Sequence, residues 1–206
     1  MTGGRADIAV FVSGGGTNLQ ALIDAEQHGS IMHGKLSLVI SSRDGVRALD
    51  RARSTGIETA VIGVEQYPER EDREREMLSL LASRGIDMII LAGYLSILSR
   101  DFVSHYPRRI INVHPSLIPA FCGEGFYGLR VHEEALRRGV RVTGATVHFV
   151  NEIPDGGEII LQRAVNVHRG DTPERLQRRV MKQAEWRILP EAAELVAREI
   201  VSGNAS

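Results

Sequence analysis

The feature that most constrains the fold is a regular alternation, across the first half of the chain, of short apolar runs with stretches of helical character. The apolar runs are nearly continuous, which is typical of parallel strands covered on both faces. The stretches between them place apolar residues at helical spacing, and several end at glycine. This alternation predicts parallel βαβ units and a doubly wound, Rossmann-like sheet. The expected strands are 7–13, 35–42, 58–64, 86–94 and 109–114, and the expected helices are 17–29, 45–56, 69–85 and 96–106.

The second half of the chain departs from this alternation. A loop with glycine and aromatic residues covers 117–128, and 129–139 predicts a short helix. The segment 141–167 predicts two strands joined by an irregular loop that contains Pro-Asp-Gly-Gly. The expected fold class is therefore α/β, with a Rossmann-like, mostly parallel twisted sheet, an antiparallel C-terminal extension and a long C-terminal helix.

Capping residues and prolines predict where helices begin and bend. Thr17 or Asn18 is expected near the N-cap of the first helix. The final helix, 172–200, begins with a threonine at the N-cap and a proline in the first turn. Pro190 lies inside this helix, so we expect the helix to kink or divide there.

Composition narrows the classes of protein. The 206 residues are 43% hydrophobic and 25% charged, as in an ordinary globular chain, and suit one domain over 1–206. The formal net charge of -1 argues against non-specific nucleic-acid binding, and no apolar run reaches the roughly 18 residues of a membrane span. The first residues are too few and too polar for a signal peptide, so we expect a cytoplasmic enzyme. Cys122 is the single cysteine, which excludes an internal disulfide and a cysteine-based zinc site.

Asn112 and His114 are the first candidate site residues. Because side chains alternate along a strand, both point to the same face of the expected strand 109–114, near its C-terminal end. Open α/β sheets bind ligands at that end, and Pro115 stops the strand there. For an isolated Asn-x-His pair, the alternative is a core histidine satisfied by a neighbouring carbonyl.

Three consecutive glycines, 14–16, join the first strand to the first helix. Backbone N–H groups converge at such a turn, where the helix dipole is positive, and glycine lets a phosphate approach closely. The loop lacks both the lysine of a Walker A motif and the spaced third glycine of a dinucleotide fingerprint. A phosphate monoester is therefore the expected ligand, and a tight turn without a ligand is the alternative.

His148 and Asp155 form a second candidate pair. His148 lies on an expected strand, and Asp155 lies in a loop whose two following glycines permit unusual backbone dihedrals. An ordinary Asp-Gly-Gly turn is the alternative. Asparagine, histidine and aspartate without a serine or cysteine nucleophile indicate proton transfer and oxyanion stabilisation, not covalent catalysis.

Five segments of the chain occur in a characteristic order and spacing: FVSGGGTNLQ, ILAGYLSILS, INVHPSLIPAF, GATVHFVNEIPDGGEIILQ and QAEWRILP. They resemble the phosphoribosylglycinamide formyltransferases of purine biosynthesis, and the resemblance runs from about residue 8 to about residue 200. It implies transfer of a formyl group from 10-formyltetrahydrofolate, a folate co-substrate, to the amine of glycinamide ribonucleotide. It also implies a nucleotide-binding half over about 8–116 and a folate-binding and catalytic half over about 117–200.

The resemblance assigns roles to individual residues. Asn112 donates an N–H to the oxyanion of the tetrahedral intermediate, and His114 donates a further hydrogen bond or a proton. Asp155 orients His114 and helps to remove the proton of the amine. No metal is implied, no nucleic acid or membrane is an expected partner, and a homodimer is left open. The expected substrate-side residues are Gly15, Gly16, Thr17, Asn18, His148, Lys182 and Glu185, and the expected folate-side residues are Arg70, Tyr94, Leu95, Ser96, Ile97, Leu98, Arg109 and Asn151.

The chain departs from the family pattern at a few positions. Leu95 and Ser96 replace a frequent Met-Arg, and the loop Phe121–Gly128 replaces a shorter Pro-Gly loop. The pterin pocket should persist, because its contacts in the family are largely made by backbone.

Other functions share parts of this pattern. Formyltetrahydrofolate deformylase uses the same Asn-His-Asp set, and methionyl-tRNA formyltransferase is a relative, but each normally has an additional domain that we do not expect here. A metal-dependent hydrolase could use His114, His148 and Asp155 as ligands, although no paired motif such as H-E-x-x-H is present. A non-catalytic nucleotide-binding module is a further alternative.

Overall fold

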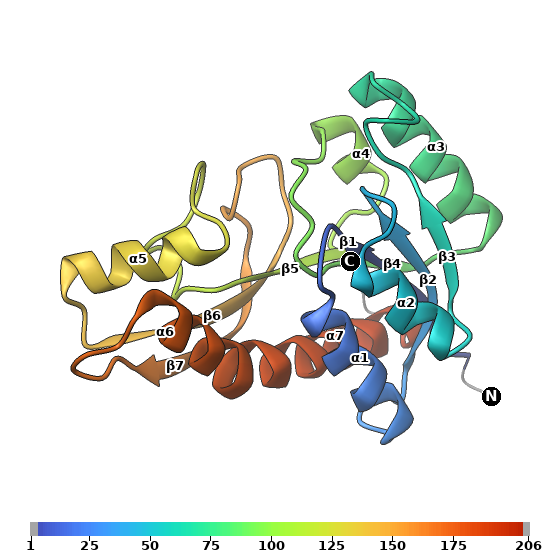
Figure 1. The fold of residues 1–206 in the computed structure, drawn as a ribbon. Helices are drawn as coiled ribbons and strands as arrows, with labels where there is room; N and C mark the ends of the chain where they lie inside the picture. Colours follow the sequence, from blue (N-terminus) through green and yellow to red (C-terminus); the bar gives the residue numbers. More distant parts are fainter. Residues whose placement is uncertain (1–3, 204–206) are drawn as a thin grey trace.

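The computed structural model of the chain describes residues 4–203. Seven strands form one sheet in the order β3-β2-β1-β4-β5-β6-β7 (Figure 1). The first five are parallel, whereas β6 pairs antiparallel with both β5 and β7, so the expected sheet with its antiparallel C-terminal extension is confirmed. The strands are β1 (Ala6–Val12), β2 (Gly34–Ser41), β3 (Glu58–Val61), β4 (Met88–Leu91), β5 (Ile110–His114), β6 (Val142–Phe149) and β7 (Ile159–Asn166).

Helices cover both faces of this sheet, and none within residues 4–203 combines the length and the apolar character needed to cross a membrane. The longest helix, at the C-terminal end, runs beside the first one (Figure 1). The helices are α1 (Thr17–Gln27), α2 (Arg47–Ser54), α3 (Arg70–Ser83), α4 (Arg100–Ser104), α5 (Leu129–Arg138), α6 (Pro173–Val180), the π-helical turn η1 (Met181–Glu185) and α7 (Trp186–Val201).

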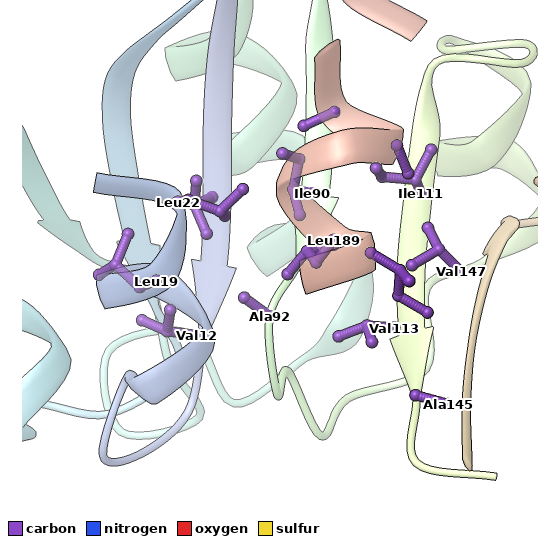
Figure 2. Close-up of a cluster of buried hydrophobic side chains, with 14 of the residues drawn as sticks. Val12, Leu19, Leu22, Ile90, Ala92, Ile111, Val113, Ala145, Val147 and Leu189 are labelled. Carbon is purple, nitrogen blue, oxygen red and sulfur yellow. The ribbon is translucent and has the colours of Figure 1, made fainter. Parts of the chain in front are cut away.

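The alternation of side chains along the strands divides the apolar residues between two cores. In β1, Ile8 and Val10 face the core made with α1 and α7, whereas Ala9 and Phe11 face the core made with α3 and α4. Figure 2 shows the first core, where Leu189 of α7 lies among residues of several strands. The strand sequences are almost continuously apolar because both faces of the sheet are buried.

The order of the strands places a crevice at the carboxyl ends of the central strands β1 and β4. From β1 the chain continues through β2 to β3 on one side, and then returns to β4 on the other side of β1. Ligands in open α/β sheets bind at such a reversal, at the carboxyl ends of the strands. The loops that follow β1, β4 and β5 therefore meet at the position where a site is expected.

The final helical segment divides upstream of the expected position. Pro190 lies inside α7 and is buried, so the expected division at this proline is wrong, whereas a kink there stays a prediction. The change of helical type occurs at Met181–Glu185, where the Trp186 N–H donates to the Met181 carbonyl, five residues back. Such π-helical turns are frequent at functional sites, because they re-aim the side chains of one turn.

Two other local expectations are corrected. Gly16, and not Thr17 or Asn18, is the N-cap of α1, in a left-handed conformation with φ 68° that glycine adopts without strain. The crossover expected as a helix over 96–106 is helical only at Arg100–Ser104, because the Ser99 side chain caps it by accepting from the Phe102 N–H. The residues before Ser99 form an irregular loop at the crevice.

Candidate active site

A cleft lies at the carboxyl ends of β1, β4 and β5 and has a volume of about 570 Å³, within the usual range for small-molecule sites. Its walls come from the loop after β4, the loop before α5, the loop between β6 and β7, and the π-helical turn. The sequence-predicted residues that line it are Asn18, Tyr94, Leu95, Ser96, Ile97, Leu98, Asn112, His114, His148, Asn151, Asp155 and Glu185.

Strand pairing brings His148 to Asn112. The two residues lie directly opposite each other in the antiparallel β5–β6 pair, so their side chains share one face of the sheet. The Asn112 Nδ2 donates to His148 Nε2 at 3.1 Å, and His148 Nδ1 donates to the Phe149 carbonyl at 2.8 Å. The second Nδ2 hydrogen has only a 3.5 Å contact with Asp155 Oδ1, so it is the one that can turn toward a substrate.

Asp155 lies over the face of the sheet that carries the Asn112 and His148 side chains. It has a left-handed backbone, with φ 55°, which is uncommon for a residue with a side chain and marks a constrained loop. Its Oδ2 accepts the Gly123 N–H at 2.8 Å and lies 3.3 Å from His114 Nδ1. Its Oδ1 lies 3.5 Å from His148 Nε2. The structure therefore brings the predicted Asn, His and Asp together, from β5 and from a loop 41 residues further along the chain.

Both ring nitrogens of His114 face protein groups. Nε2 donates to the Phe121 carbonyl at 2.8 Å, which leaves Nδ1 facing the Asp155 carboxylate. The neutral ring has no hydrogen on Nδ1 in this tautomer, whereas a proton taken up there would lie between the imidazole and the carboxylate. This arrangement suits a pair that holds a proton for a short time better than a histidine that donates to an oxyanion.

Burial and charge oppose each other in this pair. Burial lowers the pKa of His114 below its ordinary value, although Asp155 and the Phe121 carbonyl act in the opposite direction. Burial also acts to raise the pKa of Asp155, but the contacts with His148, His114 and the Gly123 N–H outweigh it, and the pKa lies below its ordinary value. At neutral pH the pair is therefore a neutral imidazole beside an ionised carboxylate.

Contacts with α2 fix the conformation of the glycine loop, residues 14–16. The Ala48 N–H donates to the Gly14 carbonyl at 3.2 Å, and Arg51 Nε donates to the Gly15 carbonyl at 3.0 Å. Gly16 must be glycine, because a Cβ there would lie 2.7 Å from the Ala48 Cβ. No side chain caps α1, so the first N–H groups of the helix stay available to an anion.

Asn18 and Glu185 join the two ends of the chain beside the cleft. The Asn18 Nδ2 donates to Glu185 Oε2 at 2.8 Å, and both residues are buried. Burial raises the pKa of Glu185 to about 7, although the hydrogen bond from Asn18 acts to lower it. The Asn18 Oδ1 is buried without a hydrogen-bond partner in the described part of the chain, which leaves an acceptor beside the cleft.

The loop after β4 forms the other, apolar side of the cleft. Leu95 and Ile97 are 56% and 61% exposed, and Ile153 across the opening is 60% exposed. The buried carboxylate of Glu74 holds the end of this loop, because it accepts from both the N–H and the hydroxyl of Ser99. The rim therefore combines a fixed backbone with apolar side chains.

Several predicted residues do not line the cleft. Arg70 pairs with Glu74 at 3.2 Å and so acts, at most, on the loop that Glu74 holds. Arg109 precedes β5, at the end of the strand opposite to His114. The others are Gly15, Gly16, Thr17 and Lys182.

The fold adds residues to the site that the sequence patterns did not indicate. His132 of α5 lines the cleft and is fully buried, and neither of its ring nitrogens has a partner among residues 4–203. Burial lowers its pKa to about 4, so the ring is neutral. The Phe121 carbonyl and the Gly123 N–H, which hold His114 and Asp155, have no sequence signal because they are backbone groups.

Within residues 4–203, no group of three or more histidine, cysteine, aspartate or glutamate side chains is arranged to hold a metal ion. His114, His148 and Asp155 do approach one another, but His114 Nε2 is occupied by the Phe121 carbonyl, and the two His148 nitrogens are occupied by the Phe149 carbonyl and by Asn112. The contacts among these residues are hydrogen bonds and close approaches to the Asp155 carboxylate.

Comparison with known proteins gives a consistent result. The profile of the formyl transferase family matches residues 6–193. The phosphoribosylglycinamide formyltransferase of Escherichia coli is 40% identical over 89% of this chain and 84% of its own length. The crystal structure of glycinamide ribonucleotide transformylase 1 from Symbiobacterium toebii matches with a TM-score of 0.87 and 42% identity, covering 94% of this chain and 88% of that one.

Longer relatives match over the same region. The human trifunctional purine biosynthetic protein adenosine-3 is 45% identical over 94% of this chain, which spans only 18% of the human protein. The chain spans 61% of the chloroplastic phosphoribosylglycinamide formyltransferase of Arabidopsis thaliana, with 39% identity.

Proposed function

Because this chain belongs to the formyl transferase family, we propose that it is a phosphoribosylglycinamide formyltransferase that transfers a formyl group from 10-formyltetrahydrofolate to the amine of glycinamide ribonucleotide. The observation that supports this most directly is the meeting of Asn112, His114 and Asp155 in one cleft. That cleft has buried polar groups at one end and an apolar rim at the other. Such a division suits a phosphorylated, hydroxyl-rich substrate and a flat aromatic one.

The residues supply the two functions that formyl transfer needs. Asn112 donates its second amide hydrogen to the oxygen of the formyl group as that oxygen becomes negative. Asp155 and His114 together accept one proton from the attacking amine and return it to the nitrogen that leaves. The number of protons balances, because the amine loses one proton and the leaving nitrogen gains one.

His148 acts on the reaction through Asn112. Its Nδ1 hydrogen is fixed by the Phe149 carbonyl, so Nε2 presents a lone pair to the Asn112 amide. This bond sets the direction in which the Asn112 amide points. His148 is therefore a positioning residue in our proposal, although the resemblance placed it among the substrate-binding residues.

The two ends of the cleft receive the two substrates. The N–H groups at Gly15, Gly16 and Thr17, which precede the cleft-lining Asn18 and lie just outside the lining, hold the phosphate of the ribonucleotide, and Glu185 accepts from a ribose hydroxyl. The loop Tyr94–Leu98 and the residues near Asn151 hold the folate, which supplies the formyl group when bound. The apolar side chains at the rim and the available backbone groups fit such a ligand.

The alternatives fit less well. The relatives compared above bear the names of formyltransferases of purine biosynthesis, which does not favour a deformylase or another hydrolase. We also propose that the reaction takes place in the cytoplasm, on the basis of the composition. The state of assembly, including the homodimer left open by the sequence, stays a prediction for sedimentation analysis.

A formyl-transfer assay tests the proposed function. The purified protein is mixed with 10-formyltetrahydrofolate and glycinamide ribonucleotide, with and without a chelator, and the release of tetrahydrofolate is followed. We expect transfer that depends on the ribonucleotide and is unaffected by the chelator. Release of formate without the ribonucleotide would identify a deformylase, and loss of activity with the chelator would identify a metal-dependent enzyme.

A further inference from the structure

Arg51 of α2 contacts the glycine loop, residues 14–16, outside the cleft. It does not line the cleft, but its Nε donates to the Gly15 carbonyl at 3.0 Å and its Nη1 donates to Gln20 Oε1 at 2.8 Å. Gln20 belongs to the first turn of α1. One guanidinium group therefore ties together the loop, the helix that the loop starts and the helix behind it.

These contacts decide where the N–H groups of the loop point. The carbonyl of one residue and the N–H of the next belong to the same planar trans peptide and point in opposite directions. The Gly14 and Gly15 carbonyls point toward α2, where the Ala48 N–H and Arg51 receive them. The N–H groups of Gly15 and Gly16 consequently point away from α2, and neither has an acceptor among residues 4–203.

A second observation at the same place indicates a ligand. Asn18, in the first turn of α1, is 8% exposed and lines the cleft, and its Oδ1 is buried without a partner in the part of the chain that the structure describes. Such a group is costly unless a ligand or a water satisfies it. Because Oδ1 accepts, it suits a hydroxyl of a sugar phosphate, whereas the unpaired N–H groups of the neighbouring loop suit the phosphate itself.

We propose that Arg51 is a positioning residue for substrate binding, which orients the Gly15 and Gly16 peptides so that their N–H groups receive the phosphate of the substrate. Its role is distinct from phosphate binding by a side chain, because the guanidinium binds the Gly15 carbonyl, on the side of that peptide away from the Gly16 N–H. Its positive charge also favours an anion on the other side of the loop. This inference rests on the proposed function, since it takes the anion to be the phosphate of a ribonucleotide.

Arg53 provides a matched control on the same helix. Its side chain is 55% exposed, and it contacts Asp50 at 3.9 Å and Thr59 Oγ1 at 3.3 Å, not the glycine loop. Arg51→Met and Arg53→Met therefore remove the same group from α2. Arg51→Lys keeps the charge but cannot make both contacts, because a lysine lacks the planar fork of donors.

Steady-state kinetics with both substrates tests the proposal. We expect Arg51→Met to raise the KM for glycinamide ribonucleotide about tenfold, the effect of losing one hydrogen bond from a charged donor. The KM for the folate should change less than about twofold, Arg51→Lys should be intermediate, and Arg53→Met should resemble the wild type. An unchanged KM for the ribonucleotide, or an equal rise of both KM values, would overturn the proposal.

A binding measurement separates this proposal from the proposed function. Inorganic phosphate is titrated into wild type and variants and followed by ³¹P NMR, which needs no formyl transfer. Weaker phosphate binding by Arg51→Met than by Arg53→Met would support the role of Arg51 even if the enzyme had a different reaction, and equal binding would contradict it. Should Arg51→Met fail to fold, Gln20→Ala removes the partner of Nη1, together with an exposed hydrogen bond from Gln20 to Asp24, and should weaken phosphate binding about threefold; no change would again contradict the proposal.

Discussion

Asn112 and His114 occupy one face of β5, yet the structure holds them differently. Asn112 keeps one amide hydrogen that is only weakly engaged, whereas both His114 nitrogens are directed at protein groups. Asn112 is therefore placed to contact the substrate, and His114 is placed to hold a proton with Asp155. Both functions are needed in the transition state more than in the bound ground state.

We expect Asn112→Ala and His114→Ala to lower kcat about 10²–10³-fold, while the ribonucleotide binds with nearly unchanged affinity. The reason is that both groups stabilise charge that develops during the reaction. Kinetics gives kcat, and calorimetry gives the affinity for the ribonucleotide. A large loss of affinity with kcat preserved would show that these residues hold the substrate.

We expect substitution of Gly15 and substitution of its neighbour Gly16 to have different effects: one on substrate binding and the other on stability. Gly15 has open space around the position of a Cβ, whereas Gly16 has φ 68° and a Cβ there would clash with Ala48. Gly15→Val should fold normally and raise the KM for the ribonucleotide at least about tenfold by covering the N–H groups, with little effect on the folate. Gly16→Val should lose a few kcal/mol of stability.

Circular dichroism and thermal unfolding, together with the two KM values, check this pair of variants. A Gly15→Val protein that binds the ribonucleotide normally and the folate poorly would mean that the two substrates occupy the opposite ends of the cleft. A fully stable Gly16→Val protein would contradict the close packing of the loop on α2.

At the scale of elements, the C-terminal helical segment begins with a strong cap. The Thr172 side chain accepts from the Arg175 N–H at 3.3 Å, and Pro173 is the first residue of α6. The Arg179 guanidinium donates two hydrogen bonds, of 2.5 and 2.7 Å, to the carboxylate of Asp171, which lies just before the cap. The start of α6 is therefore fixed at both the backbone and the side-chain level.

Thr172→Ala should lower the free energy of unfolding by about 1 kcal/mol, because an N–H at the start of α6 loses its acceptor. Thr172→Ser keeps the hydroxyl and serves as the control. Urea unfolding of the three proteins measures the difference. Equal losses for alanine and serine would attribute the effect to the methyl group of threonine and not to the cap.

At the scale of the whole molecule, the packing of α7 along α1 brings together residues 167 positions apart. Glu185, at the end of the π-helical turn, reaches Asn18 at the start of α1. The carboxyl is buried at the junction of the two halves of the chain, and its pKa is raised to about 7. This junction makes the stability of the whole protein depend on pH.

The sign of this dependence follows from the raised pKa. Between the ordinary value of 4.5 and about 7, the folded protein keeps a proton on Glu185 that the unfolded chain releases, so this group lowers stability as the pH rises through that window. Glu185→Gln removes the effect. Its stability relative to the wild type should be less than about 1 kcal/mol higher at pH 5, and on the order of 3 kcal/mol higher at pH 8.

Urea unfolding of wild type and Glu185→Gln at both pH values measures this difference. The same variant should bind the ribonucleotide more weakly at pH 8, because an amide accepts a hydroxyl hydrogen less strongly than a carboxylate does. A stability difference that is the same at pH 5 and pH 8 would show that Glu185 is ionised in the folded protein across this range.

Local sequence patterns were sufficient for much of the fold. Continuous apolar runs identified the strands, and the β-strand period of two placed Asn112 and His114 on one face, as the structure has them. The glycines at 14–16 identified the loop before α1. These features depend on neighbours within a few residues, so the residues themselves contain the information.

The rest depended on contacts between distant segments. The register of β5 and β6 sets His148 against Asn112, the loop backbone at Phe121 and Gly123 holds His114 and Asp155, and the packing of α7 brings Glu185 to Asn18. No local period encodes such a register or the direction of a peptide group. The register of the strands and the direction of the peptide groups follow from burying both apolar faces of one sheet at once. They are therefore determined only by the packing of the whole folded chain.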